Sequence, residues 1–482
     1  MPSEYERDRY ELGYAYQQQG HYISLSYMNN DTGETGTPAL PMDIVYVDSQ
    51  FIRSEYRYSG NNVGVDVSLA NSNVEHLMNN FNLRQANPLK LRSSLTTVEA
   101  NDIKLVTKID VANGYWNVGV DYHDALHDAD ISDPSNAGFF IENFNQAENQ
   151  IAGLFFETQQ QLSSIFGLDA GLRLNRVTAN SGEINTSMAM MPPVKMLRDA
   201  FNNAEREQTD NNIDAVLKLS IQVNAQWLLY GGIAQKNRSG SYQERYLWLP
   251  MQSTGGLADG FNYIGNIDIK PEVAQEIELG FDWHGASTVI SPRIFYRDVS
   301  DYIQGTPTTN TQAIMVSNNM GNPNKPLEFN NVDATFIGFD MPWHVSLNDN
   351  WALHGAINMV RGERKDIEDN LYRISPDNMR VAADFMLKQW KTTLELVAYD
   401  KQDKVSVTNN EQETAGYALV NFFVDYAITN DLNIFAGVEN LFDKNYQDHL
   451  TGINRAKGDD VEIAQRLPGV GRNFYTRLRW SF

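Results

Sequence analysis

The sequence predicts an all-β protein, a transmembrane antiparallel β-barrel with about 19 of the roughly 22 strands found in plugged barrel transporters. Three observations lead to this fold class. Many short runs alternate apolar and polar residues, their connections alternate in length, and no run of about 18 apolar residues could form a membrane-spanning helix. A mean hydropathy of −0.44 is compatible with a membrane barrel, because only one face of each strand meets lipid.

Period-two alternation identifies the strands. In residues 277–283 the odd positions are apolar, whereas Glu278, Gly280 and Asp282 occupy the even ones. A strand places successive side chains on opposite faces, so this pattern gives one apolar and one polar face. The same alternation marks residues 10–16, 23–27, 63–69, 116–120, 215–221, 420–426 and 474–482.

The connections between these runs alternate between short turns and long polar loops. The short ones include 59–62, 113–114, 284–285 and 348–350. The long ones are expected near 30–46, 70–92, 122–144, 178–208, 236–269, 299–327, 361–377, 402–414 and 443–471. Outer-membrane barrels have short periplasmic turns and long extracellular loops, whereas a soluble sandwich or propeller has no such two-sided bias.

The strand number predicts how much of a barrel the sequence contains. Single-chain bacterial barrels have an even number of strands. About 19 strands, the first followed by a short turn, would need a parallel contact between the first and last strands to close the barrel. We therefore expect residues 1–482 to be the C-terminal part of a barrel that lacks roughly its first three strands. Residues 1–4, Met-Pro-Ser-Glu, do not begin a signal peptide, which agrees with this expectation.

The composition and the motifs argue against several functions. The chain has 61 acidic and 38 basic residues and a formal net charge of −23, which disfavours nucleic-acid binding and suits loops that attract cations. It contains no cysteine, so disulfides are excluded. No His-Glu-x-x-His, glycine-rich phosphate loop or Gly-x-Ser-x-Gly motif is present. We predict that the protein is not an enzyme and has no catalytic cofactor.

The last hairpin resembles that of a known family. Residues 440–446 read Asn-Leu-Phe-Asp-Lys-Asn-Tyr, and the final strand alternates apolar and polar residues before ending on Phe482. Both features resemble the C-terminus of TonB-dependent outer-membrane receptors. The resemblance implies a place in the cell outer membrane of a Gram-negative bacterium, with Phe482 read by the barrel-assembly machinery. It also implies coupling to the TonB-ExbB-ExbD complex through a plug domain and its TonB box, which this sequence does not show.

Two loop segments are similar to those of copper receptors within that family. Residues 37–43 read Thr-Pro-Ala-Leu-Pro-Met-Asp, and residues 75–84 contain His76 and Met78. By this resemblance His76 and Met78 are the barrel half of a copper site. Imidazole and thioether are soft ligands that suit copper, and an i, i+2 spacing points both side chains the same way in an extended backbone. The alternative is a loop histidine and methionine that pack on their neighbours. The resemblance places the matching Cys-x-x-x-Met pair in the plug, so two ligands alone predict a weak site.

Other groups of soft or acidic side chains are weaker candidates. Met188, Met190, Met191 and Met196 crowd one long loop, where they could relay a soft metal or simply pack between loops. His123 and His127 have the spacing to chelate on one helical turn, although a solvated acidic loop explains them better. Met315 and Met320 form a weaker pair. We assign no role to the scattered histidines His21, His284, His344, His354 and His449.

The function predicted from the sequence is uptake of copper, as transported cargo, by a TonB-dependent outer-membrane receptor. One alternative is a ferric-siderophore receptor of the same family, which predicts loops rich in aromatic residues and arginine. The other is a passive porin-like channel, which predicts a complete and even set of strands. The methionines at 188–191 favour copper over a siderophore, and the resemblance of the final hairpin argues against a porin.

Overall fold

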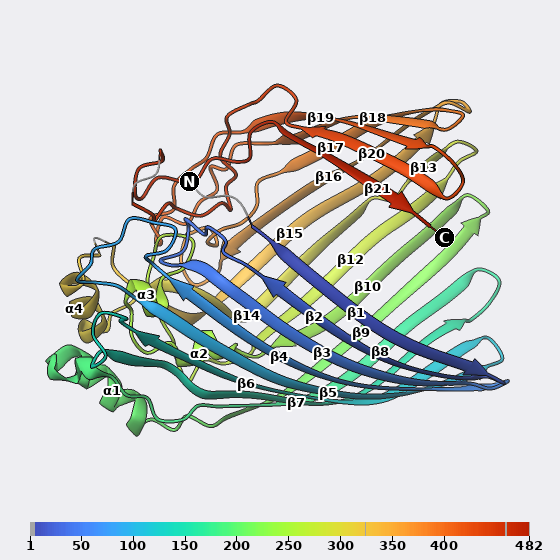
Figure 1. Ribbon diagram of the computed structural model, residues 1–482. Coiled ribbons are helices and arrows are strands. Elements are labelled where there is room, and N and C mark those ends of the chain that lie inside the picture. Colours follow the sequence, from blue (N-terminus) through green and yellow to red (C-terminus); the bar gives the residue numbers. More distant parts are fainter. Residues whose placement is uncertain (1–4, 323, 458–459, 482) are drawn as a thin grey trace.

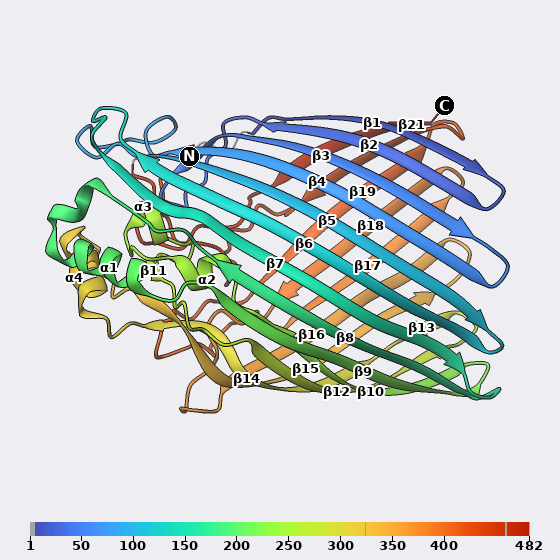
Figure 2. The same cartoon turned by 90° about the horizontal axis from the view of Figure 1, so that it is seen from below.

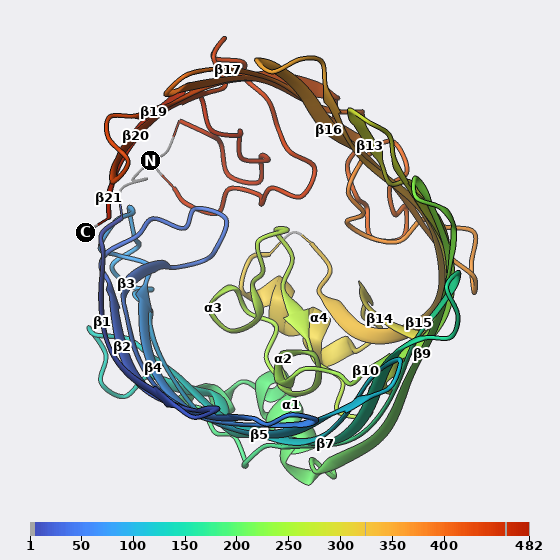
Figure 3. The same ribbon diagram turned by 90° about the vertical axis from the view of Figure 1, so that its right-hand side faces the viewer.

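Neighbouring antiparallel strands build a wall around a lumen, seen from the side in Figure 1 and along the barrel axis in Figure 3. The computed structural model describes residues 5–322, 324–457 and 460–481. The strands are β1 (Arg7–Gln18), β2 (His21–Thr32), β3 (Asp43–Ser59), β4 (Val63–Asn79), β5 (Ser93–Val111), β6 (Gly114–Ser132), β7 (Phe140–Gln161), β8 (Phe166–Asn180), β9 (Gln208–Asn224), β10 (Trp227–Arg238), β11 (Tyr263–Ile264), β12 (Glu272–His284), β13 (Thr288–Ile290), β14 (Arg293–Pro307), β15 (Leu327–Ser346), β16 (Trp351–Arg364), β17 (Asn378–Leu387), β18 (Trp390–Tyr399), β19 (Tyr417–Ala427), β20 (Leu432–Glu439) and β21 (Asn473–Trp480).

The pairing of these 21 strands gives 19 positions in the wall. β11 belongs to a loop and pairs in parallel with β15 over two residues only. β13 and β14 follow each other along the same stretch of wall, because both pair with β12 on one side and β15 on the other. The predicted fold class and strand number are therefore confirmed.

The two faces of each strand have the predicted chemistry. On β12 the outward residues Ile277 and Leu279 are 55% and 56% exposed, as expected for side chains that meet lipid. The lumen-facing Glu276 pairs with Arg297 on β14, and Glu278 pairs with Arg293 at 3.2 Å. Opposite charges on adjacent strands thus line the lumen, where water screens them.

Aromatic rings form a belt next to the short turns. Ring contacts join adjacent strands there, with centroids 4.8 Å apart for Trp351 and Phe385 and 4.3 Å apart for Trp390 and Tyr426. Trp227 lies 5.2 Å from Phe281 in the same belt. Amphipathic rings prefer the boundary between hydrocarbon and water, so the belt marks one membrane interface. No helix in the described part of the chain is long and apolar enough to cross a membrane.

The barrel is taller on one side than on the other. β7 has 22 residues, whereas β21 has 8. At about 3.3 Å per residue these strands are roughly 73 Å and 26 Å long. Figure 2 shows the long strands reaching toward the helices at the loop end, which we call the mouth.

The long strands correct two predicted loops. Residues 70–79 and 122–132 were expected in loops, but they continue β4 and β6. An uninterrupted ladder joins β4 to β5 from the Val63–Ile109 pair to the Asn79–Ser93 pair. The alternation was hidden because polar residues occupy the outward positions 71, 73 and 75 once the strand leaves the lipid.

The loops at the mouth have a hydrophobic core of their own. They carry α1 (Pro192–Asn203), α2 (Tyr242–Tyr246), α3 (Gln252–Gly255), α4 (Thr311–Asn319) and the 3-10 helix η1 (Ser187–Met190). Val194, Leu197 and Phe201 bury one face of α1 at helical spacing. These side chains join what we call the mouth core, whose other fully buried members include Ile131, Ile141, Ile184, Tyr246, Leu249, Val316 and Leu327.

The first and last strands of the wall run in the same direction. Both arrows point to the turn end in Figure 1, because β1 leads into a short turn and β21 comes from the last long loop. Strand pairing in the described residues includes a ladder between β1 and β2 and one between β20 and β21, but none between β1 and β21. All twelve residues of β1 are exposed.

Candidate functional site

His76 and Met78 lie near the mouth on the lumen face of β4. The outward positions of this strand are apolar from Val63 to Leu69 and polar at 71, 73 and 75, so residues beyond 70 stand outside the lipid. His76 and Met78 have the opposite parity and share the lumen face. Across the ladders, His76 is opposite Val47 and Thr96.

The imidazole of His76 is available as a metal ligand. Its Nε2 atom is buried and has no hydrogen-bond partner among the described residues. Burial lowers the pKa of His76, so the ring is neutral at neutral pH. A neutral ring presents a lone pair, and buried polar atoms without partners are uncommon in native proteins. The next lumen-facing residue on β4, Met78, adds a thioether sulfur.

A buried ion pair joins the two segments that resemble copper receptors. Arg84 contacts Asp43 at 2.5 Å, and both side chains are 6% exposed. Arg84 Nη1 also donates to the Leu40 carbonyl at 2.9 Å, while the Thr37 amide donates to Asp43 Oδ1 at 2.7 Å. The loops 33–42 and 80–92 are thereby fixed beside the end of β4. Both segments were recognised from the sequence, but this ion pair was not predicted, although one segment ends on Asp43 and the other on Arg84.

The methionines at 188–191 lie on another part of the rim. Met188 and Met190 are in η1, and Met191 is the residue before α1. Met188 and Met191 pack against the mouth core, whereas Met190 is 92% exposed. Paired residues lead from Met78 across β5, β6 and β7 to Thr186, four steps of about 4.8 Å or roughly 19 Å. These methionines are therefore too far from His76 to bind the same metal ion.

The structure corrects the interpretation of His123 and His127. Both lie on strand β6, so neither the helical turn nor the solvated loop applies. Four residues of strand separate them by roughly 13 Å, too far for one ion. The His127 ring stacks on Tyr242 with centroids 4.1 Å apart, and His123 Nδ1 lies 2.8 Å from Asp102 Oδ1. They are parts of the lumen wall.

The remaining candidates are separate from His76. Met315 is half exposed on α4, and Met320 packs against the mouth core. His449 is buried against Glu411 and Thr414, which both lie on the loop between β18 and β19. Within residues 5–322, 324–457 and 460–481, no three His, Cys, Asp or Glu side chains are grouped to hold a metal ion. Phe482, predicted to be read by the barrel-assembly machinery, lies outside the described residues.

Comparison with known proteins identifies the family. Residues 2–441 match the family model described as TonB dependent receptor-like, beta-barrel. This chain belongs to the TonB-dependent receptor family. No curated protein sequence matches it.

Solved structures share the receptor's fold at low sequence identity. A copper transporter, OprC, superposes with a TM-score of 0.83 at 18% identity, over 100% of this chain and 72% of that one. The ferric-catecholate import receptor Fiu of Escherichia coli K12 gives 0.66 at 12% identity, over 99% and 75%. The pyoverdine receptor FpvA of Pseudomonas aeruginosa PAO1 gives 0.67 at 12%, over 99% and 72%.

Membership of the family indicates the cellular location of the receptor and the orientation of its barrel. TonB-dependent receptor barrels are outer-membrane proteins of Gram-negative bacteria, and the family works with the TonB energising system. The family and the similar structures are transport receptors. The short turns of this barrel therefore face the periplasm, and its mouth faces the cell surface.

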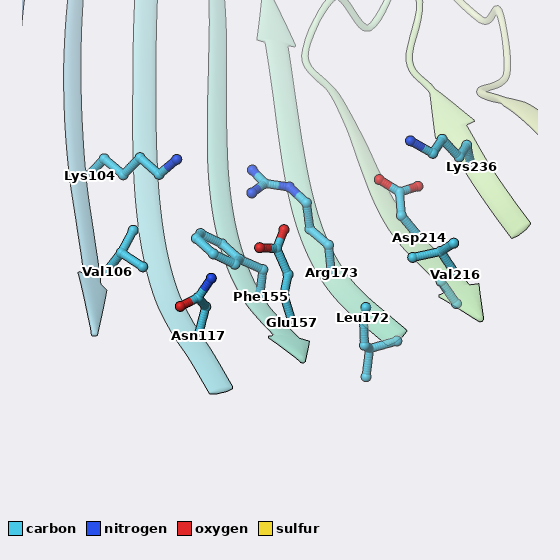
Figure 4. Close-up of a pocket in the computed structure, with 12 residues that line it drawn as sticks. Lys104, Val106, Asn117, Phe155, Glu157, Leu172, Arg173, Asp214, Val216 and Lys236 are labelled. Atoms are coloured by element: carbon cyan, nitrogen blue, oxygen red, sulfur yellow. The ribbon is translucent and has the colours of Figure 1, made fainter. Parts of the chain in front are cut away.

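The lumen wall of the receptor contains a polar recess of about 350 Å³, shown in Figure 4. Arg173 reaches across its edge to Asp121 with two hydrogen bonds of 2.6 and 2.7 Å. Lys104 lies over the Phe155 ring at 5.5 Å. None of the twelve lining residues carries an imidazole, thiol or thioether, so the recess has no soft metal ligand.

Proposed function

We propose that this receptor takes up copper at the cell surface, with His76 and Met78 as the ligands contributed by its barrel. One observation carries the proposal: the buried Nε2 atom of His76 has no hydrogen-bond partner in the described part of the chain, and the Met78 thioether follows on the same lumen face of β4. Two soft donors in one place favour copper over hard cations such as Ca²⁺ and Mg²⁺.

The surroundings of the two ligands support this proposal. The Arg84–Asp43 ion pair fixes the loop before β3 to the loop after β4, so the ligands are held on a rigid part of the rim. The structural similarity to the copper transporter, at a TM-score of 0.83, exceeds that to Fiu and FpvA, at 0.66 and 0.67. Since two donors are fewer than a tight site uses, we expect weak binding by these two alone.

The methionines at 188–191 have a different role in this proposal. Met190 is almost fully exposed on η1, where its thioether meets the surrounding water. A soft metal ion that binds there transiently would be held near the lumen entrance before it reaches His76. Met190 is therefore the exposed donor of an outer capture point, with Met188 and Met191 beside it, and the three do not belong to the coordination sphere of His76.

Titration of the folded receptor with Cu(I), in competition with a chromophoric chelator, tests the assignment. We expect His76→Ala/Met78→Ala to weaken Cu(I) binding by at least about tenfold, because both direct donors are lost. The matched control is His123→Ala/Met386→Ala, which removes a lumen histidine and an exposed methionine near the turn end of β17. Equal loss of affinity in both double variants, or none in the first, would contradict the proposal.

A further inference from the structure

Two histidines on neighbouring strands lie directly opposite each other near the turn end of the barrel. His344 is on β15 and His354 is on β16, and the antiparallel ladder between these strands pairs the two residues. His344 is an even number of residues from Asp340, which contacts the lumen-facing Arg293 at 2.7 Å, so it shares the lumen face. The strands are joined by the short turn 347–350. Both imidazoles therefore face the lumen at its periplasmic end.

The two rings are already close to the separation that a shared metal ion requires. Their centroids are 6.4 Å apart, and their planes are inclined by 20°. With metal–nitrogen bonds of about 2.0–2.1 Å, a ring centroid lies roughly 3 Å from the ion, so two rings on one ion are at most about 6 Å apart. His344 is exposed and His354 is half-buried, so small rotations of the two side chains close the remaining gap.

One nitrogen of each ring is free to bind an ion. His344 Nε2 lies 3.1 Å from Ser346 Oγ, and His354 Nε2 lies 3.4 Å from Asp384 Oδ2. Neither Nδ1 atom has a hydrogen-bond partner among the described residues. A proton on Nε2 is shared with these oxygens and leaves a lone pair on Nδ1. Contacts of this kind orient histidines that bind metals.

The charged side chains around the pair balance one another. Asp384 is only 8% exposed and contacts Lys391 at 3.1 Å, so its carboxylate offsets the ammonium charge. Arg380, on the same strand as Asp384, contacts Glu395 at 3.6 Å. A cation at the two histidines therefore does not face an uncompensated positive charge.

We propose that His344 and His354 chelate one divalent transition-metal ion, with Cu²⁺ as the most strongly bound. Imidazole is a ligand for zinc, nickel and copper, and the affinity of a given site for first-row divalent ions is highest for Cu²⁺. Water completes the coordination, since no group of three His, Cys, Asp or Glu side chains suited to a metal ion occurs in the described part of the chain. Two protein donors predict weaker binding than in a structural metal site.

This site is separate from the one proposed at His76. Figure 3 shows β4 and β16 on opposite arcs of the ring, and His76 is near the mouth whereas His344 and His354 are near the turns. The donors differ as well, because a thioether favours Cu(I) and a pair of imidazoles suits Cu²⁺. The proposal therefore does not rest on the proposed uptake of copper through His76 and Met78.

Isothermal titration of the folded full-length chain with Cu²⁺ tests the proposal, with glycine present to compete for weakly bound ions. We expect the affinity for one Cu²⁺ to fall by at least about tenfold in His344→Asn and in His354→Asn, because each variant loses one of two donors. The matched control is His284→Asn, which removes an exposed histidine beside another short turn. His76→Ala/Met78→Ala should leave this affinity unchanged, which separates the two proposed sites.

Two measurements on the unaltered chain guard against a variant that misfolds. Pulsed electron paramagnetic resonance of the chain with one Cu²⁺ should show two coordinated imidazoles. Cu²⁺ should also slow the reaction of diethyl pyrocarbonate with His344 and His354 more than with His284, as read by mass spectrometry of the peptides. A signal from a single imidazole, equal protection of the three histidines, or unchanged affinity in both single variants would each overturn the proposal.

Discussion

The wall and the mouth of this receptor are stabilised in different ways. In the wall, ladders pair each strand with its neighbours, and the apolar side chains point outward to lipid. In the mouth, loops far apart in the sequence bury apolar side chains against one another, as in a water-soluble protein. Trp248, for example, is 2% exposed and donates to the Glu142 carbonyl at 2.9 Å. One chain therefore removes apolar side chains from water in two ways: in the wall they face lipid, and in the mouth they pack against one another.

Removal of the largest side chain of the mouth core separates the two regions most sharply. We expect Trp248→Ala to destabilise the mouth by about 3–5 kcal/mol, because a cavity replaces the indole ring. Hydrogen exchange should accelerate in residues 181–271 and stay unchanged in the strands near the turns. Trp351→Ala, in the lipid-facing belt, is the control and should leave the mouth unchanged. Accelerated exchange throughout the barrel would show that the wall and the mouth unfold as one cooperative unit.

A charge on the lipid face tests the wall. We expect Leu279→Arg to cost about 2–4 kcal/mol of folding free energy in lipid bilayers, because the guanidinium displaces an apolar contact near the middle of the membrane. Asn117→Arg, which places the same side chain on the lumen face, should change stability by less than about 1 kcal/mol. Denaturant unfolding in vesicles measures both variants. Similar costs for both would mean that the two faces do not differ as described.

A helix cap tests the mouth on a smaller scale. Asn310 caps α4 by accepting hydrogen bonds from the amides of Gln312 and Ala313, at 3.0 and 3.2 Å. Asn310→Ala should destabilise α4 by about 1 kcal/mol, while Asn310→Ser should restore most of the loss. Hydrogen exchange of residues 311–319 reports the effect. Equal exchange in the alanine and serine variants would exclude capping as the cause.

The smallest expected effect is on the pH dependence of the folding stability. Because burial lowers the pKa of His76, the unfolded chain binds a proton at this residue more readily than the folded chain. The stability due to neutral His76 is complete above about pH 6.5, the unperturbed value, and is lost as the pH falls through the lowered pKa. His76→Gln should reduce the loss of stability between pH 7 and pH 5, measured by denaturant unfolding. An unchanged pH dependence would contradict the burial of His76.

Much of the wall could be predicted from the sequence because its pattern is local. In residues 277–283 the alternation alone indicates which side chains meet lipid, and the same holds for most lipid-spanning segments. The ends of the long strands could not be predicted, since Asn71, Asn73 and Glu75 face water outside the membrane and break the apolar alternation. In such a segment the sequence of a strand is as polar as that of a loop, so the two cannot be told apart.

The site was less predictable than the wall. His76 and Met78 stand out by residue type, and their shared face follows once β4 extends past them. The Arg84–Asp43 ion pair is not visible in the sequence, because it depends on which loops fold against one another.

The unequal strand lengths give the rim a slope. β7 with 22 residues and β21 with 8 stand on different arcs of the ring, so one arc projects from the outer surface like a collar while the other stays low. On the low arc the long loops that follow β18 and β20 turn in over the lumen (Figure 3), whereas on the high arc the strands themselves form the rim. His76 stands on the high arc, on the inner side of that collar. The entrance is therefore framed by paired strands on one side and by loops on the other, so its two edges differ in construction as well as in height.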